Sequence, residues 1–102
     1  MRLKYAPTGR GFGRIEFRDR YENECSIQKS SLATEDAIWF GINDAKPQVL
    51  VEGQGWTPVE FPSETSFWTR MHLTQSQVKK LLPILQHFAE TGELPEKPQR
   101  KR

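Results

Sequence analysis

The sequence has little cysteine and no long apolar run, and both shortages exclude whole classes of protein. Cys25 is the only cysteine in the 102 residues, so no disulfide can form within the chain. A lone cysteine in a strand-like segment is typical of a small buried side chain in a reducing compartment. No apolar run approaches the ~20 residues that span a bilayer, and the N-terminus lacks the apolar segment of a secretory signal. We therefore expect one soluble intracellular domain.

Histidine is also scarce, which counts against metal binding and acid–base chemistry. His72 and His87 are the only histidines, and with Cys25 they show no metal-ligand spacing. Cys25 lies in an alternating segment that should turn it into the core, where a thiol is inert. Ser30 and Ser31 lack a nucleophile-elbow pattern, and there is no Walker loop. We expect no metal, no cofactor and no enzymatic activity.

Positive charge is concentrated at the two ends of the chain. Residues 1–20 carry a balance of +4 and residues 95–102 of +3, whereas residues 21–94 carry −5, for a net charge of +2. An acidic body argues against binding to duplex DNA, because neutralisation of phosphates dominates that affinity. Residues 1–12 are predicted as a flexible basic segment leading into the domain, and residues 95–102 as a disordered basic tail.

Alternation of apolar and polar residues predicts a small antiparallel sheet. The period of two around a polar turn predicts a hairpin at 13–18 and 24–29. Residues 1–7 could add an edge strand. Residues 56–61 contain one proline and are followed by another, at 58 and 62, so they fit only an edge or irregular segment. Further strands are predicted at 37–42, 48–51 and 65–73.

The segment after Thr74 predicts one amphipathic helix of about 17 residues. Thr74 and Gln77 have the spacing of a capping box, and Gly92 stands where a left-handed C-cap belongs. Apolar residues at helical spacing form a stripe, which we call the helix stripe: Val78, Leu81, Leu82, Ile84, Leu85 and Phe88. The predicted fold class is α+β: a four- to five-stranded antiparallel sheet packed by one C-terminal helix, in a single domain spanning 1–94.

The loop after residue 28 is the first half of the predicted ligand site. Lys29, Ser30, Ser31 and Thr34 offer an ammonium, hydroxyls and backbone amides to an anionic group. The alternative is structural, with the hydroxyls capping turns and Lys29 pairing with one of the acids at positions 35 and 36.

The predicted last strand supplies the second half of the site. Trp68, Arg70 and His72 would share one face of a strand at 65–73. Arginine grips phosphate through two hydrogen bonds, and an aromatic ring stacks on a base. Together the two halves predict a site for a nucleotide or another small phosphorylated ligand.

Large aromatic side chains are more numerous than one sheet and one helix can cover. They are Trp39, Phe40, Trp56, Phe61, Phe67 and Trp68. We expect a homo-oligomer, a dimer or higher, or a surface for another protein, with Trp39, Phe40 and Trp56 at the interface.

Three segments resemble a family of small phage and prophage accessory proteins. They are CSIQKSSLATEDAIWFGI at 25–42, TRMHLT at 69–74 and LLPILQHFAETGEL at 81–94, and the resemblance covers roughly residues 14–94. It implies a viral accessory protein that acts in the cytoplasm of a bacterial host. Small phage proteins often block host defence by binding an enzyme, a guide complex or a signalling nucleotide. The preferred hypothesis is a non-enzymatic counter-defence protein that sequesters a phosphorylated ligand. The alternative is an inhibitor of a host defence protein that uses an aromatic sheet face.

Overall fold

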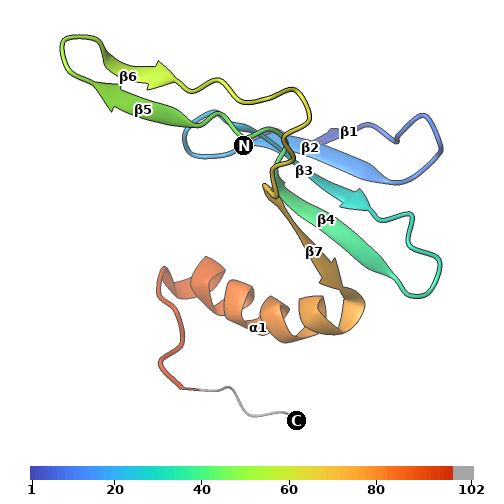
Figure 1. The fold of residues 1–102 in the computed structure, drawn as a ribbon. Helices are drawn as coiled ribbons and strands as arrows, with labels where there is room; N and C mark the ends of the chain where they lie inside the picture. Colours follow the sequence, from blue (N-terminus) through green and yellow to red (C-terminus); the bar gives the residue numbers. More distant parts are fainter. Residues whose placement is uncertain (98–102) are drawn as a thin grey trace.

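The computed structural model describes residues 1–97, which form a five-stranded antiparallel sheet, a separate two-stranded hairpin and one helix (Figure 1). In the order in which they lie side by side, the strands of the main sheet are β1 (Lys4–Tyr5), β2 (Arg14–Arg18), β3 (Glu24–Lys29), β4 (Ala37–Ile42) and β7 (Arg70–Thr74). The hairpin pairs β5 (Gln48–Val51) with β6 (Gly55–Pro58), and α1 spans Gln75–Thr91. The predicted α+β class is confirmed.

The hairpin of β2 and β3 closes through a turn built on Asp19. The Asp19 carboxylate accepts hydrogen bonds from the backbone amides of Tyr21 and Asn23, both at 2.9 Å, and from the Asn23 side chain at 3.1 Å. Such side-chain-to-backbone bonds fix a turn locally. The hairpin predicted at 13–18 and 24–29 is therefore present at Arg14–Arg18 and Glu24–Lys29.

The possible edge strand at 1–7 is present as β1, because Lys4–Tyr5 pairs with Glu16 and Ile15 of β2. The segment predicted as a flexible entry at 1–12 therefore includes a paired strand. Of the predicted basic tail, residues 98–102 lie outside the described residues. Within residues 1–97, no helix combines the length and the apolar character needed to cross a membrane.

The register of the main sheet separates a polar face from an apolar face. Residues paired across antiparallel strands project to the same side. The polar face carries two rows that run from β2 to β7: Glu16, Ser26, Gly41 and Arg70; and Arg14, Gln28, Trp39 and His72. The apolar face carries Ile15, Phe17, Cys25, Ile27, Ile38, Phe40, Met71 and Leu73.

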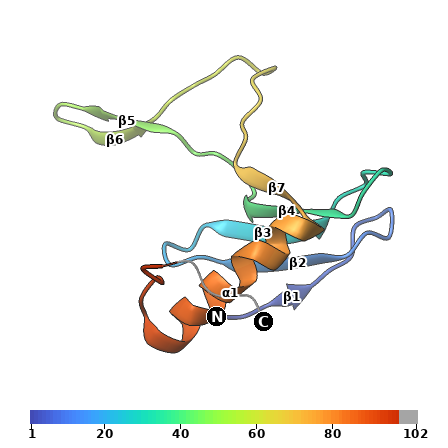
Figure 2. The same ribbon diagram turned by 90° about the horizontal axis from the view of Figure 1, so that it is seen from below.

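Helix α1 begins directly after β7 and has the predicted caps. Thr74 accepts a bond from the Gln77 amide at 3.2 Å, and Gln77 accepts one from the Thr74 amide at 2.9 Å. Gly92 adopts φ 77° and donates to the carbonyl of Phe88 at 2.8 Å. The helix lies below the sheet in Figure 1 and crosses it in Figure 2, which is seen from below. It contacts β7, yet none of its residues is buried.

The described residues bury little apolar surface. Cys25 and Ala37 are the buried apolar residues among them. The radius of gyration is 17.4 Å, whereas a compact domain of this length has about 13 Å. The β5–β6 hairpin stands away from the main sheet in both views (Figures 1 and 2). The chain is therefore more open than a self-contained domain.

The last strand is shorter than predicted. β7 begins at Arg70, and residues 65–69 are not in a strand, so that part of the prediction is wrong. β4 ends at Ile42, where the chain turns and Asn43 bonds back to Glu24, so residues before Arg70 have no neighbouring strand to pair with. The alternation of apolar and polar residues at 65–69 is typical of a strand, but it does not show whether a neighbouring strand is there to pair with.

Candidate functional site

The polar face of the sheet brings two arginines together on one amide oxygen. Arg70 of β7 donates from Nη1 to Oε1 of Gln28 at 3.2 Å and lies 3.5 Å from the Ser26 hydroxyl. Arg14 of β2 donates from Nη1 to the same Gln28 oxygen at 2.5 Å. Gln28 of β3 therefore links two guanidinium groups from strands that are not neighbours.

Gly41 of β4 leaves the space that this arrangement needs. It pairs with both Ser26 and Arg70, so it lies directly between β3 and β7. Its φ is +149°, and a Cβ atom built there would lie 2.7 Å from the carbonyl oxygen of Thr69. Because glycine carries no side chain, the Arg70 side chain can cross β4 and reach β3.

Two flat rings lie beside Arg70. Trp39 and His72 stack with ring centroids 3.8 Å apart and an interplanar angle of 9°. The Arg70 guanidinium carbon lies 5.8 Å from the Trp39 ring centroid, within cation–π range. His72 Nε2 is 2.9 Å from the Ser30 hydroxyl, which fixes the plane of the imidazole.

The charge of this cluster is not balanced by its own carboxylates. Arg14 has an ion pair with Glu16 at 3.2 Å, and among the ion pairs of residues 1–97 none includes Arg70. Both guanidinium groups are partly shielded from water, where charges interact more strongly than in bulk solvent. Two cations and one carboxylate leave a local excess of positive charge, which an anion would neutralise.

A hollow of about 280 Å³ opens next to Arg70. Trp39 and Asn43 form one side of it, and the loop 66–69 with Arg70 forms the other. Asn43 is held by the Ser26 hydroxyl at 2.6 Å. Trp68 lines the hollow and is 90% exposed. Ligand pockets range upward from about 300 Å³, so the hollow suits one small group such as a phosphate with part of a base.

Lys29 is not part of this cluster. It alternates with Gln28 along β3 and therefore projects to the opposite face of the sheet. There it forms an ion pair with Asp36 at 2.8 Å, and this hydrogen bond lowers the pKa of the Asp36 carboxyl. The structural alternative for Lys29 is thus the arrangement observed.

The hydroxyl groups of the predicted loop lie in two different environments, one buried and the others exposed to solvent. Ser30 is buried, contacts His72 and accepts the Leu32 amide at 3.2 Å, so it belongs to the polar-face cluster. Ser31 and Thr34 are exposed in the turn before β4. Of the predicted ligand residues, the structure brings together Ser30, Arg70 and His72, with Trp68 at the adjoining hollow.

The three predicted interface aromatics do not form one surface. Trp39 lies on the polar face and Phe40 on the apolar face, where it meets Phe17 edge-on at 6.3 Å. Trp56 is on β6 in the separate hairpin and is 66% exposed.

The register of the sheet separates Cys25 from His72, one of the two thiol–imidazole pairs that the sequence offers. Cys25 and His72 project from opposite faces of the sheet, so they cannot form a thiol–imidazole pair. Burial, with the nearby charge of Asp19, raises the pKa of the Cys25 thiol. Within residues 1–97, no group of three or more histidine, cysteine or acidic side chains could hold a metal ion.

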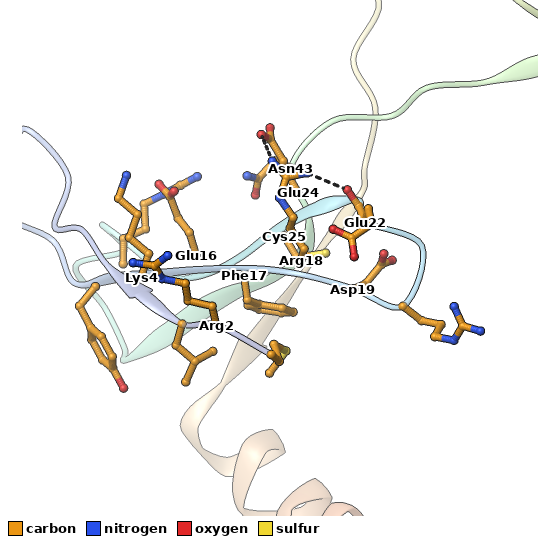
Figure 3. Close-up of a pocket in the computed structure, with 15 residues that line it drawn as sticks. Arg2, Lys4, Glu16, Phe17, Arg18, Asp19, Glu22, Glu24, Cys25 and Asn43 are labelled. Carbon is orange, nitrogen blue, oxygen red and sulfur yellow. Dashed lines mark hydrogen bonds and ion pairs between the residues drawn. The ribbon is translucent and has the colours of Figure 1, made fainter.

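A larger concavity of about 1400 Å³ lies along β1, β2 and the Asp19 turn (Figure 3). Its five basic and four acidic side chains are interleaved, as Arg18 beside Glu24 shows. Figure 3 also shows Glu16 and Phe17 projecting to opposite sides of β2, so the concavity wraps around the open edge of the sheet. Arg14 and Glu16 of the polar face also line this concavity. Its basic and acidic side chains are close to balanced in number, which makes it a poorer anion site than the part of the polar face around Arg70.

Comparison of the chain with protein-family models, with curated proteins and with solved structures found no match. The comparisons therefore assign no role to the residues of the polar face.

Sequence reasoning did not select the residues that hold Arg70 or line the hollow beside it: Arg14, Ser26, Gln28 and Asn43. The alternation of β2 and β3 already placed the first three outward. What linked them to Arg70 was the strand order, which puts β4 between β3 and β7.

Proposed function

We propose that the protein binds a small phosphorylated ligand, a nucleotide, on the polar face of its sheet. The observation that carries the proposal is the pair of guanidinium groups, Arg14 and Arg70, that share Gln28 Oε1 and, within residues 1–97, have only Glu16 to balance them. A phosphate would accept charge-assisted hydrogen bonds from Arg70. The exposed ring of Trp68 at the hollow offers a stacking surface for a base.

We propose binding without turnover as the activity. Ser30 and His72 are close enough for a nucleophile and base, but the Ser30 hydroxyl is buried and already accepts the Leu32 amide. A buried, bonded hydroxyl is a positioning group for His72. Together with the resemblance to phage accessory proteins, this supports sequestration of a defence-signalling nucleotide as the biological role.

The test is calorimetric titration of cyclic dinucleotides, cyclic trinucleotides and linear mononucleotides into the wild-type protein and two variants. Arg70→Gln removes the unpaired charge, and Arg18→Gln is the matched control, since Arg18 is exposed and paired with Glu24. Loss of a charged hydrogen bond of roughly 1.5–3 kcal/mol predicts about a 10- to 100-fold weaker affinity for Arg70→Gln. Arg18→Gln should bind as the wild type does.

Two results would overturn the proposal. One is the absence of heat and of any thermal shift with every nucleotide at concentrations well above micromolar. The other is equal affinity in the two variants. Ligand released by denaturing the complex should be chemically unchanged, and the appearance of a hydrolysis product would replace sequestration with catalysis.

A second candidate function is capture of a host protein by the β5–β6 hairpin. The hairpin exposes Val49, Leu50 and Trp56 at 49%, 63% and 66%. An isolated two-stranded hairpin is marginally stable in water, so contact with another protein would stabilise it. Trp56→Ala should abolish capture without changing nucleotide affinity.

A further inference from the structure

The apolar side of the molecule is uncovered. The helix stripe is exposed from Leu81 to Phe88, with Leu82, Leu85 and Phe88 at 59%, 55% and 53%. Met71 on the apolar sheet face is 56% exposed. Helix α1 lies on this side of the sheet, but its main contact with the sheet is with β7 alone. Apolar surface on a helix and on a facing sheet is the surface that normally forms a core.

The chain exposes enough surplus surface to form the interface of an obligate dimer. The chain exposes 9247 Å², whereas a folded monomer of this size exposes about 6,000 Å². The excess is about 3,000 Å², part of it in loops and chain ends. Obligate homodimers bury roughly 2,000–5,000 Å² in total, so each chain has enough surplus surface to supply its half. A contact that the fold needs for its own core has to be present whenever the chain is made, which favours a second copy as the occupant.

The charged residues of α1 leave the helix stripe free for a second copy. At about 100° per residue, Lys79, Lys80 and Glu90 lie about 120° or more around the helix from the centre of the stripe. Two copies that meet along their stripes therefore bring no like charges together at the centre of the interface. A self-complementary apolar surface of this kind is what a two-fold interface requires.

The junction of sheet and helix favours an antiparallel pair. Thr74 ends β7 and caps α1, so each sheet is held at the N-terminal end of its own helix. Parallel helices would place both sheets at the same end of the pair, whereas antiparallel helices place them at opposite ends. The antiparallel arrangement also opposes the two helix dipoles, which is the favourable orientation.

We propose that the protein is a homodimer in which the α1 helices of two copies pack antiparallel along the helix stripe. A two-fold axis between Ile84 and Leu85 places Leu81 of one copy opposite Phe88 of the other, and by symmetry this contact occurs twice. The interface buries apolar residues that one chain alone leaves exposed to water.

The interface shares no residue with the proposed nucleotide site. Arg14, Arg70 and Trp39 project from the polar face, whereas α1 lies on the apolar side of the sheet. A dimer built on α1 therefore leaves two polar faces open to solvent, and the two proposals can fail separately.

Sedimentation over a dilution series from micromolar to nanomolar concentration tests the dimer. Leu85→Glu introduces a charge next to the two-fold axis in both copies and should raise the dimer dissociation constant at least 100-fold. Lys80→Glu is the matched control, because it changes a charge on the side of the helix away from the helix stripe, and it should dimerise as the wild type does. Circular dichroism checks that the two variants keep the wild-type helix content.

Cysteine cross-linking tests the antiparallel geometry without a charge in the interface. In a Cys25→Ala background, Leu81→Cys and Phe88→Cys are oxidised separately and as an equimolar mixture. The mixture should form the cross-linked dimer, whereas each variant alone should not, because identical positions lie about 10 Å apart along the helix axes.

Three results would overturn the proposal. A wild-type chain that stays monomeric at every concentration excludes the dimer. If Lys80→Glu raises the dimer dissociation constant as much as Leu85→Glu does, the helix stripe is excluded as the interface. Efficient cross-linking of Leu81→Cys with itself excludes the antiparallel arrangement and indicates a parallel one.

Discussion

Replacement of Gly41 in β4 by alanine should cost more stability than replacement of Gly13, which precedes β2. Gly41 has φ +149°, a region that side chains rarely adopt, and a Cβ atom would lie 2.7 Å from the Thr69 carbonyl oxygen and 3.0 Å from the Arg70 Cα atom. Both neighbours are backbone atoms, so neither can move aside as a flexible side chain would.

The magnitude follows from two contributions. A strained backbone conformation costs on the order of 1–3 kcal/mol, and forcing an extra carbon into a filled space costs about 1–3 kcal/mol. We expect Gly41→Ala to lower the free energy of unfolding by about 3 kcal/mol, a large share of the roughly 5–15 kcal/mol that a domain has. Arg70 should also lose its path across β4 to Gln28.

Urea unfolding followed by tryptophan fluorescence measures the effect. Gly13→Ala is the matched control, because a Cβ atom at Gly13 would have no heavy atom within 4 Å and the residue has no positive φ. It should change the free energy by less than about 1 kcal/mol. An equal loss in both variants, or a Gly41→Ala midpoint equal to that of the wild type, would refute the reasoning about the close approach of β4 and β7.

Two further predictions concern titratable groups. Burial raises the pKa of the Cys25 thiol, so a thiol reagent at about pH 8 should label the native protein at least tenfold more slowly than the urea-unfolded protein; equal rates would contradict its place in the apolar face. Hydrogen bonds from Asn23 lower the pKa of Asp19 in the folded state, so its stabilising contribution is present above its unfolded pKa and is lost as pH falls through the folded pKa. The stability gap between wild type and Asp19→Asn should therefore close between about pH 5 and pH 2, and a gap that stays constant would count against the Asp19 turn.

Local patterns predicted the elements well where one segment carries its own signal. The capping box of Thr74 and Gln77, the C-cap at Gly92 and the β2–β3 hairpin all depend on residues close in sequence, and each is present. The strand predicted at 65–73 failed over 65–69 because a strand also needs a neighbour, and sequence alternation does not report one.

Only part of the candidate site was predicted, because sequence alternation does not show which strands are neighbours. Arg70 and His72 were found because they share one strand with an evident alternation. Arg14 and Gln28 join them only through the order of the strands and through the missing side chain at Gly41. Lys29 was placed with them because it adjoins Ser30 in sequence, but neighbours along a strand project to opposite faces. A shift of one position along a strand moves a side chain to the other face of the sheet. Grouping residues 29–34 as one loop did not distinguish the two faces.

The absence of a linker between β7 and α1 couples the helix to the polar face. A change in the tilt of the helix has to be absorbed by the backbone at Thr74, two positions from His72. Any molecule that reorients the helix would therefore shift the stacked imidazole on the opposite side of the sheet. Nucleotide affinity and helix contacts would then depend on each other, although no residue is shared between them.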